Sequence, residues 1–416
     1  MKGEFKALSS TSTAHFSNDG IFFLFSALIV YYSAPPLNLN VLILGYFASI
    51  YTLISGLLSL PVGKWSDSGD RDPELMTLGI LVLGISLIIF SIPFFLGSSP
   101  GMLVNYTLVG IGAFALGFGQ AFYHPLGANI LRYSLRGMDS SFLLGINGSF
   151  GSLGRAVLFF IAGIMIIDLG AFRGLFLLSF YYFAISIFIY YTSKDLRKAG
   201  KGIKVNKERQ KSVMTPISSF KGVIPFLGIL VATMFLRSAF QLAISIYIFK
   251  FIDDTFRNGF LSYLFLLIAL IAPILGQPLF GHITRKIGGN LTLLIAGIIS
   301  LFSFIPFLIF SNYYILALLF FAIYVFAAFT GFPSLLGFIN QKIPREISTR
   351  ANTWVWGIGN TVGGAVGIML FTLISEVYNL NLKSTFEIML TFLAVSIVTN
   401  LFIEHYSKKL KSQITV

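Results

Sequence analysis

The sequence predicts an all-α integral membrane protein with twelve transmembrane helices in two related bundles of six. Hydrophobic residues make up 56% of the 416 positions and charged residues only 11%, whereas a soluble domain carries about 25% charged residues. The apolar residues come in long blocks, each near the ~20 residues that a helix needs to cross a bilayer. The loops between the blocks alternate in positive charge, which is typical of a chain that crosses a membrane repeatedly.

Twelve blocks are long enough to span a membrane, and the lipid bilayer is therefore the first partner that the sequence predicts. The predicted spans are residues 14–34, 41–62, 74–96, 102–131, 140–167, 172–192, 221–249, 257–280, 290–311, 314–340, 350–375 and 384–404.

Positive residues gather in one set of loops, which contains Lys64, Arg71, Arg132, Arg136, Arg285, Lys286, Lys342, Arg345 and Arg350. The opposite set contains only Arg173, Lys250, Arg257 and Lys383. Because positive loops stay in the cytoplasm, we expect a multi-pass plasma-membrane protein whose N- and C-termini are both cytoplasmic. The net charge of +13 is thereby explained by orientation, and we expect no nucleic-acid partner.

A basic, polar segment divides the chain into an N-terminal six-helix bundle (1–192), a cytoplasmic linker (193–220) and a C-terminal six-helix bundle (221–416). The two halves repeat each other's motifs. "LPVGKWSDSGDR" follows the second span and "QPLFGHITRKIGG" the eighth, while "GINGSFGSLG" and "GIGNTVGGAVG" lie in the fifth and eleventh. Related halves are typical of transporters whose site lies between them.

These features together resemble the major facilitator superfamily of transporters. That family carries G-x-x-x-D-x-x-G-R-[KR] between helices 2 and 3, and here Gly63, Asp67 and Arg71 have the matching spacing, with Gly69 one place early. The resemblance implies a twelve-helix carrier that works by alternating access. We expect it to be a monomer and to need no cofactor. The resemblance also implies that Gly63, Asp67 and Arg71 form a conformational gate; a merely solvated loop is the alternative.

A narrower resemblance is to the fosmidomycin-resistance-like branch. It rests on "AHFSND" opening the first span, "FYHPLG" closing the fourth and "GQPLFG" closing the eighth. The branch implies proton-driven efflux of drug-like or anionic molecules, although members of such branches differ widely in substrate.

Ionisable residues inside a span are functional hypotheses by default. Asp19 lies fifteen residues before Pro35, which places it roughly 22 Å from the outer end of its helix. His15 is one turn below it, Asn18 is adjacent, and His124 reaches a similar depth from the fourth span. We expect Asp19, His15 and His124 to form a proton-coupling site; the alternative is a structural hydrogen-bond cluster.

Two arginines also lie deep in spans. Arg155 is near the middle of the fifth span and Arg237 near the middle of the seventh, and no acidic residue is evident at their depth in the nearby sequence. Guanidinium groups bind carboxylates or phosphates bidentately. We therefore expect Arg237 and Arg155, with Gln241 and Asn18, to bind an anionic substrate. The alternative is that each arginine bonds to backbone carbonyls or to asparagines such as Asn129, Asn147 or Asn360.

Other features are assigned structural roles. Closely spaced glycines in the fifth and eleventh spans favour tight helix packing. Trp65, Trp354 and Trp356 are expected to form an interfacial aromatic belt.

Several function classes are excluded because the residues or motifs that they require are missing from the sequence. The sequence contains no cysteine, which excludes thiolate metal sites. It also contains no H-E-x-x-H, P-loop or G-x-S-x-G motif, so we expect neither an enzyme nor an ATP-driven pump. The first hypothesis is proton-coupled export (antiport) of a small anionic or drug-like compound. The alternatives are proton-linked uptake or exchange of a small organic anion, and a non-transporting membrane sensor.

Overall fold

The computed structural model describes residues 2–68, 71–134, 140–196, 220–343, 351 and 353–414. The first half of the described chain contains α1 (Lys2–Gly20), α2 (Leu24–Ser33), α3 (Val41–Ser68), α4 (Asp72–Leu96), α5 (Met102–Ser134), α6 (Ser140–Leu169), α7 (Ala171–Ser193) and the short 3₁₀ turn η1 (Lys194–Leu196). The second half contains α9 (Phe220–Phe256), α10 (Gly259–Ile287), α11 (Gly289–Ile309), α12 (Tyr314–Ala328), α13 (Gly331–Lys342), the π-helix η4 (Trp354–Val362), α15 (Gly363–Val377) and α16 (Leu382–Ile414).

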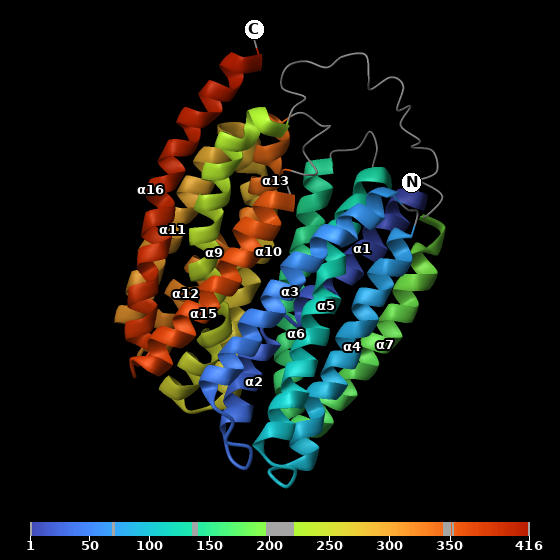
Figure 1. Cartoon of the computed structure of the whole chain (residues 1–416), viewed down its shortest axis with the longest axis vertical. Helices are drawn as coiled ribbons and strands as arrows, with labels where there is room; N and C mark the ends of the chain where they lie inside the picture. Colours follow the sequence, from blue (N-terminus) through green and yellow to red (C-terminus); the bar gives the residue numbers. More distant parts are fainter. Residues whose placement is uncertain are drawn as a thin grey trace.

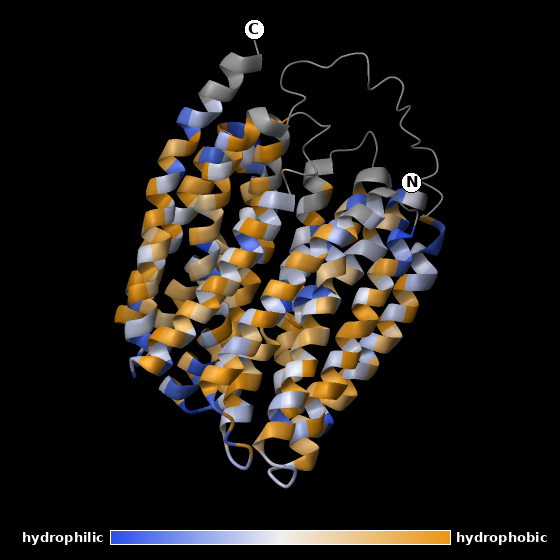
Figure 2. Ribbon diagram, in the orientation of Figure 1, coloured by the Kyte–Doolittle hydropathy of each residue, from blue (hydrophilic) through white to orange (hydrophobic). Residues whose placement is uncertain are grey.

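Eleven helical stretches of the described chain are long and apolar enough to cross a membrane. The twelfth predicted span, 314–340, is built from the shorter apolar helix α12 followed by α13. The prediction of an all-helical, multi-spanning membrane protein is therefore confirmed. Large hydrophobic side chains such as Leu275, Phe302 and Ile315 are exposed on the outside, and Figure 2 shows hydrophobic residues along the outer faces of the helices.

The helices form two groups that lie side by side, α1 to α7 and α9 to α16, and both chain termini lie at the same end of the molecule (Figure 1). We call this the terminal end, and the opposite end, with the short connections, the hairpin end. The groups meet where α6 packs on α10 and where α3 packs on η4 and α15. Ser149 donates to Ile274 O at one contact (2.9 Å) and Ser49 to Ala365 O at the other (2.8 Å). These contacts join the fifth span to the eighth and the second to the eleventh, as a two-fold relation between halves requires.

Glycines allow helices within each group to pack very closely, as predicted. A Cβ placed on Gly154 of α6 would collide with the backbone carbonyl of Phe16 in α1, and one on Gly367 of α15 would collide with that of Ala239 in α9. A larger residue at either position would push the two helices apart. Packing of α6 against α1 in this way determines where the polar residues of α1 lie.

Three spans depart from regular α-helical structure, which was not predicted from the sequence. The first span is interrupted by a turn over residues 21–23, and the tenth by a turn at Phe329 and Thr330. The eleventh begins with the π-helix η4, and the side-chain hydroxyl of Thr361 donates to Trp356 O within it (3.1 Å). Irregular backbone at membrane depth is tolerated where it is buried in protein or lines a cavity, and π-segments are frequent at functional sites.

Some predicted features fall outside the described residues. They are Gly69, Arg136, Arg345, Arg350 and most of the linker, together with the side chains of Lys64, Asp67 and Arg132. The division of the chain at 193–220 therefore stays a prediction.

Candidate functional site

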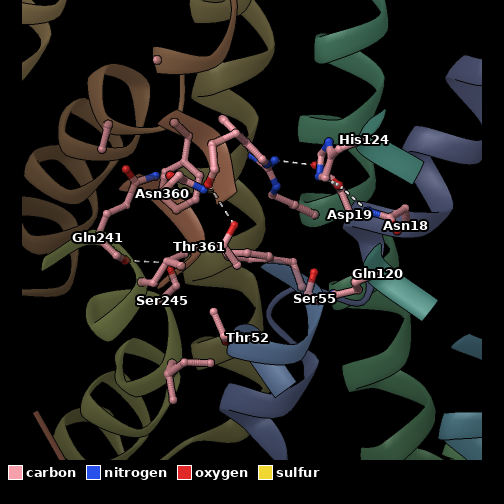
Figure 3. A pocket seen from close by; sticks show the side chains of 18 of the residues that line it. Asn18, Asp19, Thr52, Ser55, Gln120, His124, Gln241, Ser245, Asn360 and Thr361 are labelled. Atoms are coloured by element: carbon pink, nitrogen blue, oxygen red, sulfur yellow. Dashed lines mark hydrogen bonds and ion pairs between the residues drawn. The ribbon is translucent and has the colours of Figure 1, made fainter. Parts of the chain in front are cut away.

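A cavity of about 130 Å³ lies between the two groups of helices. The interrupted spans contribute Phe22, Phe329 and Trp356 to its wall. Its polar lining consists of His15, Asn18, Asp19, Thr52, Ser55, Gln120, His124, Arg155, Arg237, Gln241, Ser245, Gln277, Asn360 and Thr361. Figure 3 shows Asn18, Asp19 and His124 on one side of this cavity and Gln241, Ser245 and Asn360 on the other.

Arg155 of α6 forms an ion pair with Asp19 of α1, through Nη2 and Oδ2. The expectation that Arg155 has no acidic partner at its depth is therefore wrong. The partner is 136 residues away in sequence and comes close because Gly151 and Gly154 let α1 approach α6: a Cβ on Gly151 would lie only 2.9 Å from Asp19 Oδ2. Asp19 is 3% exposed, so the pair neutralises a buried charge that alone would be costly.

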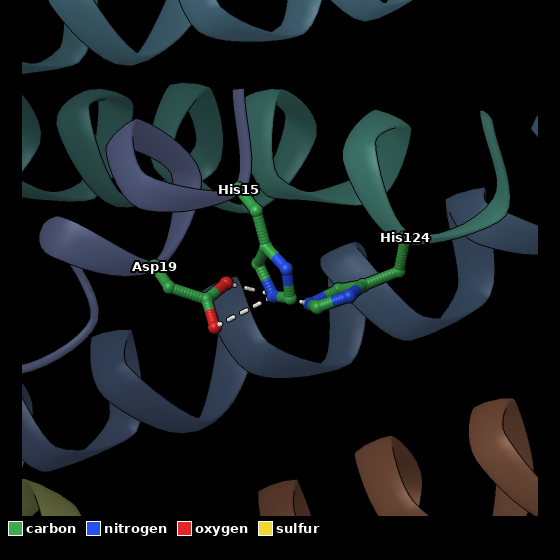
Figure 4. Close-up of side chains that lie close together, drawn as sticks. All are labelled: His15, Asp19 and His124. Carbon is green, nitrogen blue, oxygen red and sulfur yellow. Dashed lines mark ion pairs between the residues drawn. The ribbon is translucent and has the colours of Figure 1, made fainter. Parts of the chain in front are cut away.

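Two histidines complete a cluster around Asp19, and their predicted proximity is confirmed (Figure 4). His15 Nε2 lies 3.2 Å from Asp19 Oδ2, and His124 Nε2 lies 3.6 Å from Asp19 Oδ1. The two imidazole rings stand edge to face with their centroids 5.6 Å apart. Asn18 belongs to the same cluster, because its Nδ2 donates to Asp19 Oδ1 (3.0 Å).

The hydrogen bonds of Asn147 in α6 determine which nitrogen of His15 carries a proton. Thr11 donates its hydroxyl hydrogen to Ala7 O (2.7 Å) and therefore accepts from Asn147 Nδ2 (3.4 Å). The amide oxygen of Asn147 must then face His15 Nδ1 (2.9 Å), and it also accepts from Tyr123 OH (2.9 Å). Because that oxygen can only accept, Nδ1 carries a hydrogen, and Nε2 is the nitrogen that faces Asp19.

Asn147 is a functional candidate that sequence reasoning named only as an arginine partner. The signal that could have found it is an asparagine inside a glycine-rich span, where an unpaired amide is costly. Its side chain is 5% exposed. Within the described part of the chain, no hydrogen bond joins one of the three candidate asparagines to Arg155 or Arg237. Asn129 instead donates to Ser66, and Asn360 accepts from Ser238.

Aromatic rings from both halves of the chain enclose the guanidinium of Arg155. Its central carbon lies 5.4 Å from the ring centroid of Phe22 and 5.4 Å from that of Phe329. Phe22 belongs to the interrupted first span and Phe329 to the interrupted tenth. Cation–π contacts of this kind strengthen when water is excluded, so they help to hold Arg155 in the wall between the halves.

Arg237 of α9 has a different environment. Its side chain is buried, and its Nη1 and Nη2 donate long hydrogen bonds of 3.4 Å to Leu293 O and Ala327 O. This is the backbone-carbonyl arrangement that the sequence analysis gave as the alternative. No carboxylate of the described residues pairs with Arg237, and both Arg237 and Gln241 line the cavity as predicted.

The cluster also has the composition of a metal site. One ligand atom from each of His15, Asp19 and His124 lies within 4.8 Å of the others. However, Arg155 already binds Asp19 Oδ2, and a guanidinium at that oxygen would repel a divalent cation. The donor set therefore fits a proton better than a metal ion.

Comparison with known proteins agrees with this architecture. The model of the Major Facilitator Superfamily matches residues 11–368. The chain belongs to this superfamily. No curated protein sequence matches significantly. Among solved structures, the crystal structure of a mutant of the nucleoside transporter NupG is similar over 96% of this chain and 99% of that one, with a TM-score of 0.70 and 14% sequence identity.

Membership in the superfamily makes this chain a secondary transporter of small molecules and not an enzyme. The superfamily fold predicted from the sequence is thereby confirmed. The narrower resemblance to the fosmidomycin-resistance-like branch stays a prediction.

The superfamily's loop motif lies at the terminal end of α3 and the start of α4. Gly63 is in the last turns of α3 and a Cβ there would meet open space, while Arg71 is exposed and precedes the first turn of α4. The gate role of Gly63, Asp67 and Arg71 stays a prediction.

Several cavity residues were missed or misassigned from sequence. Trp356 was expected in an interfacial belt, but its indole packs against the imidazole of His124 with 5.6 Å between centroids. The belt expectation is therefore wrong for Trp356, because the π-helix η4 turns it inward. Gln277 and Gln120 were not considered, although polar residues within apolar spans were the signal that could have found them.

Proposed function

We propose that this chain carries a small organic anion together with a proton, across a plasma membrane in which both termini face the cytoplasm. The ion pair between Asp19 and Arg155 is the observation that supports proton coupling most directly. A proton on Asp19 removes the negative charge that holds Arg155, which then becomes available to a carboxylate or phosphate. Proton binding and anion binding therefore favour each other, as in proton-linked uptake.

The two histidines supply the proton in this scheme. His124 is the more exposed member of the cluster, with 25% of its side chain accessible against 5% for His15, and it takes up a proton from the cavity. His15 Nε2 contacts the same Asp19 oxygen that Arg155 binds. His15 therefore lies against the oxygen that must gain the proton for Arg155 to be released.

The charge balance of the cavity supports an anionic substrate. Among its described lining residues there are two arginines, Arg155 and Arg237, and one carboxylate, Asp19. If the histidines are neutral, these lining residues carry a net charge of one positive unit. An unbalanced buried charge is energetically costly. A bound anion beside Arg237 and Gln241 would balance it.

Proton-driven export of an amphipathic anion or drug-like compound is the second candidate. The aromatic rings of Phe22, Phe329 and Trp356 in the cavity wall favour it, since they suit an apolar substrate body. Both candidates use the same residues, and the direction of proton-driven flux separates them.

The test is transport into proteoliposomes under an imposed pH gradient, with aliphatic carboxylates, phosphate monoesters, amphipathic drugs and a nucleoside as solutes. For the uptake proposal, anion flux in the direction of the proton gradient is expected. Asp19→Asn should abolish gradient-driven flux, and Arg237→Gln should lower the apparent anion affinity at least tenfold. Asp254→Asn and Arg173→Gln remove the same groups from exposed positions at the hairpin end and should leave transport unchanged.

Other outcomes would contradict specific parts of the proposal. Anion flux against the proton gradient would identify export. Transport of the nucleoside alone, unaffected by Arg237→Gln, would show that the substrate is not an anion. Unchanged gradient-driven flux in Asp19→Asn would show that Asp19 has no coupling role, and movement of no solute would favour a sensor.

A further inference from the structure

Gln277 of α10 has an amide that the interrupted tenth span holds in one orientation. Its Nε2 donates to Phe329 O with a distance of 2.8 Å. That carbonyl lacks a helical donor four residues on, because Pro333 has no N–H. Since a carbonyl can only accept, the amino group of Gln277 must face Phe329, and the direction of Oε1 is thereby fixed.

The fixed Oε1 atom of Gln277 is a buried acceptor. It has no hydrogen-bond partner among the described residues, and the side chain is 3% exposed. Its neighbour across the interface is Gly148 of α6, where even a Cβ would lie only 3.1 Å from Oε1. A buried acceptor without a protein partner is expected to bond to a group from outside the protein. Gln277 is one of the residues that line the central cavity.

The side-chain oxygen of Asn18 in α1 is a second buried acceptor. Its Nδ2 donates to Asp19 Oδ1, and because a carboxylate only accepts, Oδ1 of Asn18 points away from it. That Oδ1 is buried and has no partner among the described residues. Figure 3 shows Asn18 beside Asp19 at the cavity wall.

The two acceptors come from different halves of the chain. Gly148 lies closest to Gln277 Oε1, and Gly151 lies closest to His15 and Asp19. These two glycines are three residues apart on α6, a rise of about 4.5 Å. Along the axis of α6, Gln277 therefore lies within about one helical turn of the Asp19 cluster. Gln277 also bonds to Phe329 O, two residues beyond the Ala327 carbonyl that Arg237 binds, so it lies near the arginine proposed to hold the anion.

We infer that Asn18 and Gln277 bind hydrogen-bond donors of the substrate, so that the transported anion carries hydroxyl or N–H groups besides its charge. This inference rests on the proposed transport function and narrows its substrate class to hydroxylated or amide-bearing anions. A site with buried acceptors rejects an analogue that lacks the matching donor, because the acceptors then remain unpaired. Each matched hydrogen bond is expected to improve affinity about 3- to 10-fold.

The experiment compares two matched pairs of probes, lactate against propionate and glycerol 3-phosphate against propyl phosphate. Binding is measured by calorimetry on the detergent-solubilised protein, and transport in proteoliposomes. The hydroxylated member of at least one pair should bind about tenfold more tightly. Gln277→Leu should reduce this ratio to within about threefold, and Asn18→Leu, which removes the second acceptor, should also lower it.

Asn105→Leu is the matched control, because Asn105 is also a buried amide that donates to a carbonyl, that of Gly97 (2.9 Å), while its Oδ1 has no partner among the described residues. It does not line the cavity, so the ratio should not change. Equal affinity within both pairs, no binding of any probe, or a ratio that is unchanged in both Gln277→Leu and Asn18→Leu would overturn the inference. Selective binding without proton-driven flux would overturn the proposed transport and leave the inference standing.

Discussion

Arg155 and Asp19 form a buried ion pair that ties α6 to α1 in the middle of the molecule. Asp19 is the member that all other groups of the cluster contact, since His15, His124 and Asn18 each approach one of its oxygens. The guanidinium of Arg155 also lies against Phe329 of the second half. A change in the charge of Asp19 would therefore alter contacts in both halves of the chain.

Removing one partner of this pair should destabilise the protein more than removing both. Asp19→Asn or Arg155→Gln alone leaves an uncompensated buried charge, which costs about 3–5 kcal/mol. The double variant leaves none and should recover at least half of that loss. The measurement is thermal unfolding in detergent.

The exposed pair of Lys250 and Asp254 at the hairpin end, 2.9 Å apart, is the control. Its loss should cost at most about 1 kcal/mol, because solvent screens it. A double variant at Asp19 and Arg155 that is as unstable as the sum of the single variants would contradict a direct interaction.

The side-chain oxygen of Asn147 should contribute strongly to stability. It accepts hydrogen bonds from His15 Nδ1 and Tyr123 OH, and all three side chains are buried. Asn147→Leu leaves both donors without this acceptor, and an unpaired buried donor costs about 1–3 kcal/mol. We therefore expect Asn147→Leu to lower the free energy of unfolding by about 2–4 kcal/mol.

The measurement is thermal unfolding in detergent. Tyr123→Phe, which removes only one of the two donors to the Asn147 oxygen, should cost about 1 kcal/mol. A loss in Asn147→Leu no larger than that in Tyr123→Phe would show that His15 does not depend on the Asn147 oxygen.

Gly154 should be far less tolerant of substitution than Gly228. A Cβ on Gly154 would collide with the backbone of Phe16, whereas one on Gly228 of α9 would meet nothing within 4 Å. Gly154→Ala should therefore lower stability by about 1–3 kcal/mol through overpacking. Gly228→Ala should leave stability unchanged or raise it by about 0.5–1 kcal/mol, since alanine favours a helix.

Thermal unfolding of the two alanine variants tests this directly. A similar effect of both substitutions would show that α1 and α6 do not approach each other as closely as described.

Cysteine labelling should establish which way the chain crosses the membrane. The chain has no native cysteine, so single cysteines can be introduced at the exposed residues Ser98 and Asn379 of the hairpin end and Lys286 of the terminal end. With cytoplasmic termini, a membrane-impermeant maleimide should label Ser98→Cys and Asn379→Cys in intact cells. It should label Lys286→Cys only after permeabilisation, and the reverse pattern would invert the proposed topology.

The sequence by itself determined the membrane fold. In lipid, a helix satisfies every backbone hydrogen-bonding group of an apolar block of spanning length. The twelve spans could therefore be predicted from the positions of these blocks in the sequence. The sequence also predicts that His15, Asp19 and His124 lie at a similar depth in the membrane. The rise per residue and the direction of the chain determine the depth of each residue along its helix.

Tertiary structure alone decided how these side chains pair. Depth says nothing about which faces of two helices meet, so the partner of Arg155 became evident only when Gly151 and Gly154 had brought α6 against α1. The interruptions in the first, tenth and eleventh spans likewise depend on neighbouring helices that satisfy freed backbone groups, as Gln277 does for Phe329. Such contacts join residues far apart in the chain, and no local pattern in the sequence encodes them.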